Sequence, residues 1–207
     1  MKRLLVIFCA ALAAGRAMGD ERAKATLDGM VAAIKNMGSY EVSFTVGAGQ
    51  WGPDVGSYVV SGEKYSLKMS AGEIFSDGKA RYEVNRNDKM VSISKPDGDG
   101  HSMFSNPARA FDFLDGTFSQ AFAGEAKRNG ANCNRIRLTA KDGSLMTVEL
   151  YVDKNSSLPV EVSYRMDDGG VAVTVNVKSV KAVGRPDPAR FRFERKNYPG
   201  YEVVDFR

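Results

Sequence analysis

The side chain best suited to acid–base catalysis at neutral pH occurs once in this chain, in a loop with two aspartates. The single histidine, His101, follows Asp97 and Asp99 in the segment PDGDGHS at 96–102. A Ser-His-Asp or Cys-His site needs a histidine held within hydrogen-bond reach of its nucleophile. No predicted strand or helix holds His101, so we interpret it as a surface-loop residue; a hydrolase would require it to be essential.

The same loop begins like a calcium-binding EF-hand and then departs from that pattern. Its two aspartates occupy the first and third ligand positions, but His101 stands at the fifth, Ser102 replaces the required glycine, and Ala108 replaces the closing glutamate. No His and Cys residues have the spacing of a zinc site, and no glycine motif joins a strand to a nucleotide-binding helix. The sequence therefore predicts no enzyme, no metal site and no cofactor.

Most of the chain predicts β-strands joined by short turns. Between Gly56 and Ala182 apolar and polar residues alternate with a period of two, as in Val148, Leu150 and Val152. The turn sequences are SDGK at 76–79, NRND at 85–88, NG at 129–130, DG at 142–143, DKNS at 153–156 and DDGG at 167–170. Such strands form an antiparallel meander, whose apolar face needs either a cover or a ligand.

A helix and a first strand precede the meander. Apolar side chains recur at three- and four-residue spacing over 23–37 and predict one amphipathic helix that ends at Gly38. Residues 40–46 alternate as a strand. Residues 47–53 predict a loop containing Trp51, which we interpret as a partly exposed cap, with a specific ligand contact as the alternative.

The candidate cover is an insertion at 104–122. Asn106 as N-cap and Pro107 at the first helical position predict a short helix over 108–114, and a second short helix is expected around 118–122. Helices this short are not stable alone, so they dock on an apolar surface, either as a permanent plug or as a lid that exchanges with a ligand. The large apolar side chains of the insertion are Phe104, Phe111, Phe113, Leu114, Phe118 and Phe122.

The first nineteen residues predict a secretory signal peptide, which leaves 20–207 as a single domain. A basic start precedes the apolar stretch from Leu4 to Ala14, which is too short to span a bilayer permanently, and Ala17-Met18-Gly19 is a small-residue cleavage site. Cys9 lies inside the apolar stretch, where no small residue precedes it, so we expect no lipidation there.

We expect cleavage between Gly19 and Asp20, because the apolar stretch ends at a small-residue site. Intact-mass measurement on the exported protein checks this. Retention of Met1 to Gly19, or a lipid adduct on Cys9, would contradict it.

Cleavage also changes the charge balance. Three of the 29 Lys and Arg residues, Lys2, Arg3 and Arg16, lie in the signal, so 26 basic and 25 acidic residues remain and the net charge is +1. A nucleic-acid-binding protein is expected to keep a basic stripe with stacking aromatics, and no such pattern is present. The one remaining cysteine, Cys133, allows no intramolecular disulfide, so stability must come from an apolar core.

Three stretches in this order resemble the periplasmic lipoprotein carriers of the LolA family, in a divergent branch. They are GEIFSDGKARYEV at 72–84, SNPARAFDFL at 105–114 and PDPARFRFERKNYPGYEVVDFR at 186–207. With the strands between them, the resemblance covers nearly all of the mature chain. It implies a mainly β fold, a curved antiparallel incomplete β-barrel whose hydrophobic cavity is covered by short helices.

The resemblance also implies a function without catalysis. Such carriers accept acylated lipoproteins from an inner-membrane ABC exporter and shuttle them through the periplasm to the outer membrane, where an acceptor is possible. The cavity and lid are expected to use Phe44, Tyr58, Val60, Tyr65, Leu67, Met69, Ile74, Tyr82, Phe111, Phe113, Leu114, Phe118, Phe122, Val148, Leu150, Val162 and Tyr164.

One departure from the family keeps an alternative open. Many members carry an early-strand arginine that latches the lid, whereas Gly62 or Glu63 falls at this place in SYVVSGEKYSLKM, residues 57–69. Either this branch closes its lid through apolar contacts alone, or it serves as a periplasmic lipid-sensing or protein-binding regulatory domain of the same fold. Identification of co-purifying periplasmic partners distinguishes the two.

Overall fold

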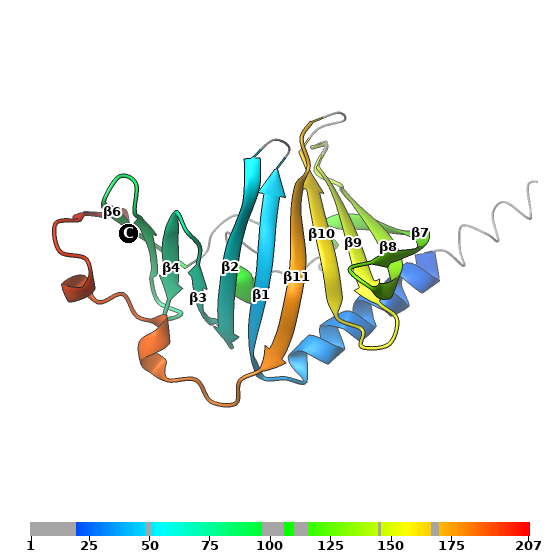
Figure 1. The fold of residues 1–207 in the computed structure, drawn as a ribbon, viewed down its shortest axis with the longest axis horizontal. Helices are drawn as coiled ribbons and strands as arrows, with labels where there is room; N and C mark the ends of the chain where they lie inside the picture. The colour runs from blue at the N-terminus through cyan, green and yellow to red at the C-terminus, as the bar shows by residue number, and fades with distance from the viewer. Residues whose placement is uncertain (1–19, 49–50, 97–105, 110–115, 145, 167–169) are drawn as a thin grey trace, which may run out of the picture. The chain divides into compact units, whose positions relative to one another are not determined.

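The computed structural model describes residues 20–48, 51–96, 106–109, 116–144, 146–166 and 170–207. Contacts within the chain divide it into two compact units (Figure 1). Unit 1 combines residues up to Ala33 with Gly116–Thr174, and unit 2 combines Ile34–Asp115 with Val175–Arg207. The expectation of one domain over 20–207 stays a prediction.

Unit 1 is an antiparallel meander with a helix on one face. Its strands β7 (Phe118–Arg128), β8 (Ala131–Ala140), β9 (Thr147–Asp153) and β10 (Pro159–Arg165) pair in sequence order. The N-terminal helix spans 20–35, and its apolar stripe of Ala23, Leu27 and Met30 is buried, as the three- and four-residue spacing predicts. Figure 1 shows this helix lying across the strands of the unit. The sheet core beneath it consists of Ile136, Leu138, Val148, Leu150 and Val162.

Unit 2 is a longer meander. Its strands are β1 (Ser39–Ala48), β2 (Trp51–Ser61), β3 (Lys64–Lys68), β4 (Gly72–Ser76), β5 (Arg81–Asn85), β6 (Met90–Ser94), most of β11 (Val173–Ala182), and β12 (Glu202–Asp205). Their order across the sheet is β12-β6-β5-β4-β3-β2-β1-β11. Consecutive neighbours from β1 to β6 are antiparallel, so the predicted meander is confirmed. The sheet does not close, which confirms the mainly β, incompletely closed fold class.

Turn chemistry fixes the hairpins where the sequence predicted them. In the SDGK turn, the Asp77 carboxylate accepts hydrogen bonds from the backbone N–H groups of Lys79 (2.8 Å) and Ala80 (3.0 Å), and Gly78 takes a φ of 85°. Burial opposes ionisation of this carboxyl, but the backbone N–H groups outweigh it and lower its pKa. The turn thus sets the register of β4 and β5.

The C-terminal segment departs from an all-antiparallel sheet. After the short 3-10 helices η3 (Pro188–Phe191) and η4 (Arg195–Asn197), β12 joins the edge of the sheet parallel to β6, with Val203 opposite Val91. A parallel neighbour needs a long connection, and residues 95–201 provide it. The third stretch of resemblance, 186–207, thus ends in a strand of the sheet.

Two predicted boundaries are wrong near residue 50. We expected a loop over 47–53, but β1 continues to Ala48, and β2 begins at Trp51 and includes Gly52 and Pro53. Ala48 pairs with Trp51. The glycines and the proline were interpreted as loop residues, yet all are tolerated in a strand end near a tight turn.

The predicted second lid helix is also wrong. Phe118, Ala121 and Phe122 lie in the strand β7, not in a helix. The first lid helix begins as predicted: Asn106 accepts a hydrogen bond from the Ala108 N–H (3.1 Å), and Pro107–Arg109 form the 3-10 helix η1. Residues 110–115, with Phe111, Phe113 and Leu114, lie outside the described residues, as do Phe104 and the 97–105 loop with His101.

Candidate functional site

One face of unit 2 gathers several of the predicted cavity residues. Phe44 on β1 pairs with Gly56 on β2, Tyr58 pairs with Leu67 on β3, and Leu67 pairs with Ile74 on β4. Directly paired residues point to the same side of a sheet. We call this side the apolar face; its residues are Tyr40, Val42, Phe44, Tyr58, Val60, Tyr65, Leu67 and Ile74.

Aromatic packing makes the centre of the apolar face dense. Tyr58 lies between Tyr40 and Phe44, with ring centroids 6.3 and 6.1 Å away. A Cβ at Gly56 would lie 2.4 Å from Cζ of Phe44, so the missing side chain makes room for that ring. Phe44, Tyr58 and Tyr65 are at most 1% exposed. The 3-10 helix η1 lies against β2 and β3.

The apolar face opens at its β4 end. There Leu67, Met69 and Ile74 line a cavity of about 200 Å³ together with Ala71, Gly72, Glu73, Glu83, Val84, Asn85 and Asn87. Met69 and Ile74 are half-buried, unlike the residues at the centre of the face. The cavity is smaller than the roughly 300–1,000 Å³ of a typical ligand pocket, so it holds only part of a long chain.

The face becomes polar beyond β4. Ser76 pairs with Tyr65 on one side and with Arg81 of β5 on the other, and Arg81 pairs with Ser94 of β6. Burial raises the pKa of the Tyr65 hydroxyl, although the Arg81 guanidinium and the Ser76 hydroxyl act in the opposite direction. An apolar half and a polar half therefore meet on one side of the same sheet.

Tyr82 is not on the apolar face. It alternates with Arg81 and Glu83, so it lies on the opposite side, where Phe75, Val84 and Val91 form a separate core. The C-terminal segment covers this core with Phe193, Tyr198, Tyr201 and Val203. Tyr82 and Phe193 stack with centroids 5.4 Å apart, and Phe193 stacks on Tyr198 at 5.3 Å. The sequence reasoning missed these covering aromatics, although their density in 191–201 was a usable signal.

The remaining predicted residues that the structure describes belong to unit 1, apart from Met69 at the cavity. Val148, Leu150, Val162 and Tyr164 are buried on the side of β9 and β10 that also carries Ile136 and Leu138 of β8. Phe118 is buried at the start of β7. They are core residues of this unit, and their assignment to a cavity stays a prediction.

Phe122 has a structural partner in unit 1. The guanidinium of Arg22, on the N-terminal helix, lies 4.1 Å from the centroid of the Phe122 ring. The same guanidinium donates to the carboxylate of Glu125 and to Oδ1 of Asn134 (3.1 Å). Cation–π contact and hydrogen bonds together fix the helix on the sheet, so Phe122 is a helix-docking residue.

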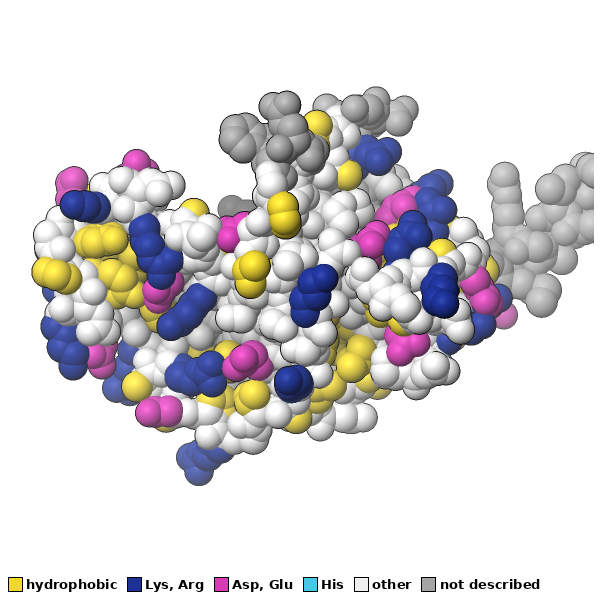
Figure 2. Space-filling view, in the orientation of Figure 1, with side chains coloured by type: hydrophobic (Ala, Val, Ile, Leu, Met, Phe, Trp, Pro, Cys, Tyr) yellow, Lys and Arg dark blue, Asp and Glu magenta, His cyan; other side chains and the backbone are white. Residues whose placement is uncertain are grey.

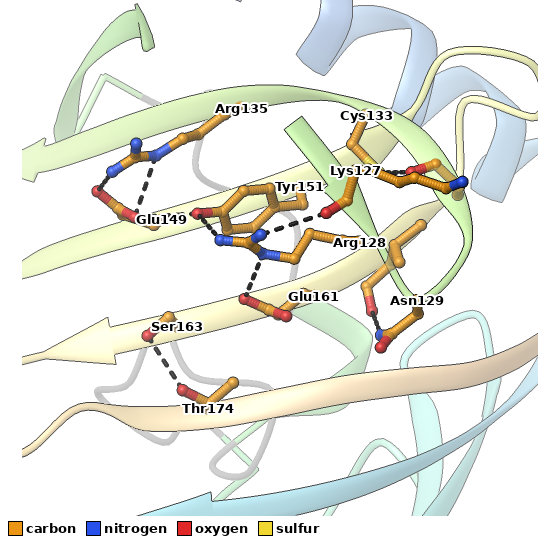
Figure 3. A network of polar contacts seen from close by, with 12 residues as sticks. Lys127, Arg128, Asn129, Cys133, Arg135, Glu149, Tyr151, Glu161, Ser163 and Thr174 are labelled. Atoms are coloured by element: carbon orange, nitrogen blue, oxygen red, sulfur yellow. Dashed lines mark hydrogen bonds and ion pairs between the residues drawn. The ribbon is translucent and has the colours of Figure 1, made fainter. Parts of the chain in front are cut away.

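The other face of unit 1 carries a network of charged residues (Figure 3). The Arg128 guanidinium lies 4.4 Å from the centroid of the Tyr151 ring and donates to its hydroxyl at 3.1 Å. Glu149 accepts from Arg135 at 2.5 Å and from Arg137 at 2.9 Å. Burial opposes its ionisation, but these two guanidinium groups lower the pKa of Glu149. The charges satisfy one another, which is typical of a structural network.

Charge elsewhere is mixed, and no metal site is formed within the described ranges. On the face shown in Figure 2, acidic and basic side chains lie among one another.

The described residues contain no cluster of three His, Cys, Asp or Glu side chains suited to a metal ion. None of the helices in this part of the chain is long and apolar enough to cross a membrane.

No family model and no curated protein matches the chain. Several solved structures match it. An uncharacterized conserved protein from Thermus thermophilus is 10% identical over 85% of this chain and 96% of its own length, with a TM-score of 0.59. MucB is 14% identical over 90% of this chain and 66% of its own, with a TM-score of 0.50. A LolA superfamily protein from Nitrosomonas europaea is 14% identical over 83% and 97%, with a TM-score of 0.41.

The chain shares the fold of the Thermus thermophilus protein and of MucB. These matches agree with the mainly β, incompletely closed fold that the three sequence stretches imply. Identities of 10–14% show the fold alone, so ligand and partners must be argued from the residues of this chain.

Proposed function

We propose that the protein is an exported carrier that binds the acyl chains of lipoproteins on the apolar face of unit 2. It accepts them from an inner-membrane ABC exporter and carries them through the periplasm toward an outer-membrane acceptor. The observation that carries the proposal is the continuous apolar face from β1 to β4, which ends in a cavity beside the half-buried Met69 and Ile74.

The energetics fit such a ligand. Each methylene removed from water contributes about 0.8 kcal/mol, so ten buried methylenes contribute on the order of 8 kcal/mol. A cavity of about 200 Å³ holds only part of such a chain. A larger site requires the cover to move away from β2 and β3, and the proposed lid residues Phe111, Phe113 and Leu114 follow η1 directly in the chain.

Acyl binding is expected to depend on Ile74. In a titration of delipidated protein with a fluorescent fatty acid, Ile74→Asn should raise the Kd about tenfold or more, because an amide then replaces apolar contact at the cavity. The matched control is Val55→Asn on β2, where the side chain is 69% exposed; its Kd should equal that of the wild type. Absence of saturable binding by the wild type, or equal effects of the two variants, would contradict the proposal.

The only support for the regulatory alternative is the likeness of the fold to that of MucB. A lipid-sensing or protein-binding domain would use the same apolar face but would retain a protein partner in place of lipidated cargo. Mass spectrometry of what co-purifies from the native periplasm separates them: lipoproteins support the carrier, and one stoichiometric unlipidated partner supports the regulator.

A further inference from the structure

Arg81 is a half-buried cation on the same side of the sheet as the apolar face. It stands on β5, one strand from Ser76 and Ile74 on β4 and two strands from Leu67 on β3. Its side chain is only 16% exposed. Its direct neighbours across the sheet are Ser76 and then Tyr65, whereas Glu83 stands opposite Ile74. Adjacent strands lie about 4.8 Å apart, so the long Arg81 side chain reaches a ligand that passes over Tyr65.

The hydrogen-bonding capacity of Arg81 is only partly used. Nη1 donates to Oε2 of Glu83 at 2.7 Å, and the Tyr65 hydroxyl is a second polar neighbour of the guanidinium. Nε is buried and has no hydrogen-bond partner among the described residues. A guanidinium offers five N–H donors, and a buried donor without an acceptor is costly. An acceptor supplied by a ligand would therefore bind here with a large gain.

Glu83 does not fill this role permanently. Its side chain is 51% exposed, in contrast to the guanidinium that it contacts. Ion pairs with an exposed partner are weak, because water competes for the carboxylate. Glu83 can exchange its contact with Arg81 for solvent when another anion arrives.

We propose that Arg81 binds the anionic head group of an acyl ligand whose chain lies on the apolar face. The ligand class is an amphiphile with a carboxylate or phosphate next to its acyl chain. From a head group at Arg81, the chain runs past its strand neighbours Ser76 and Tyr65 toward Leu67 and the cavity. Arginine binds such oxygens through charge-assisted, often bidentate hydrogen bonds. The inference rests on the proposed acyl-binding face and names a second ligand class for it, because the ester- and amide-linked acyl chains of a lipoprotein carry no such anion.

Two probes with the same chain test the head-group site. Pyrenedodecanoic acid and its methyl ester are titrated into delipidated protein at about pH 8, where the free acid is ionised. The wild type should bind the acid about tenfold or more tightly than the ester, as expected for a charge-assisted hydrogen bond. Arg81→Gln should remove this preference and leave the ester affinity unchanged. Arg137→Gln, a change at an exposed strand arginine of unit 1, should keep the preference.

The Glu83→Gln variant tests the head-group site without changing Arg81. Removal of the competing carboxylate should increase the preference for the acid several-fold. Excess acetate should not displace the acid, since the chain supplies most of the affinity. Displacement by acetate would show a site for free anions and overturn the inference. If the wild type binds the acid and the ester equally well, or if Arg81→Gln keeps the preference for the acid, the head-group site is overturned and the carrier proposal stays intact. If neither probe binds, the carrier proposal itself is overturned.

Discussion

Replacing Gly72 with alanine is expected to lower the free energy of unfolding by about 3 kcal/mol, at the upper end for overpacking. A Cβ at Gly72 would lie 2.0 Å from the backbone oxygen of Val84, on the neighbouring strand β5. A backbone oxygen cannot turn away as a side chain does, so β4 and β5 must separate there. Equilibrium urea unfolding of the purified variant measures the loss.

Gly52→Ala is the matched control. Gly52 also lies in a strand, β2, but a Cβ there would meet no atom within 4 Å. Its unfolding free energy should stay within about 0.5 kcal/mol of the wild type. Equal stability of Gly72→Ala and Gly52→Ala would show that β4 and β5 do not approach as closely as the structure indicates. Gly72 also lines the cavity, so its variant should bind acyl probes more weakly.

The period-two pattern predicted the strands and which residues of a strand share one side of the sheet. In β2 and β3, apolar residues alternate with Ser57, Ser61 and Lys68, with Val59 as the exception, and the register places Tyr58, Val60 and Leu67 on a common face. The turn residues then fixed which strands pair. Both signals are local, and local signals survive in a single sequence.

The face of Tyr82 could not be predicted in the same way. Tyr82 and Val84 alternate with Arg81 and Glu83, which shows that they share a side but not which side. Register with β4 decides this, and in β4 both Ile74 and Phe75 are apolar, one on each face. A one-residue shift in register would exchange the two faces, so the sequence of this hairpin permits either assignment.

Phe118 and Phe122 show a different ambiguity. Their spacing, with Ala121, fits one face of a helix, yet positions 118, 120 and 122 also fit one face of a strand. The strand forms because β7 finds a partner in β8, with an irregularity between Phe122 and Glu125 where Gly124 takes a φ of 104°. Likewise, the Arg128–Tyr151 contact joins residues 23 positions apart, and no local pattern predicts it.

Phe193→Ala is expected to lower the free energy of unfolding by about 2–3 kcal/mol, because the ring is half-buried between two others. Tyr82 stacks on one side at 5.4 Å and Tyr198 on the other at 5.3 Å. Tyr198 in turn donates to the Glu73 carboxylate at 3.0 Å. Burial, followed by the charge of Glu73, raises the pKa of Tyr198, so its hydroxyl stays protonated and keeps this bond at neutral pH.

Phe206→Ala provides the control within the same segment. Its ring is 67% exposed, so its loss should change the unfolding free energy by no more than about 0.5 kcal/mol. If the C-terminal segment covers the core of Phe75, Val84 and Val91, Phe193→Ala should also increase amide hydrogen exchange in β5 and β6, whereas Phe206→Ala should not. Equal unfolding curves and exchange rates for the two variants would show that the segment does not cover this core in solution.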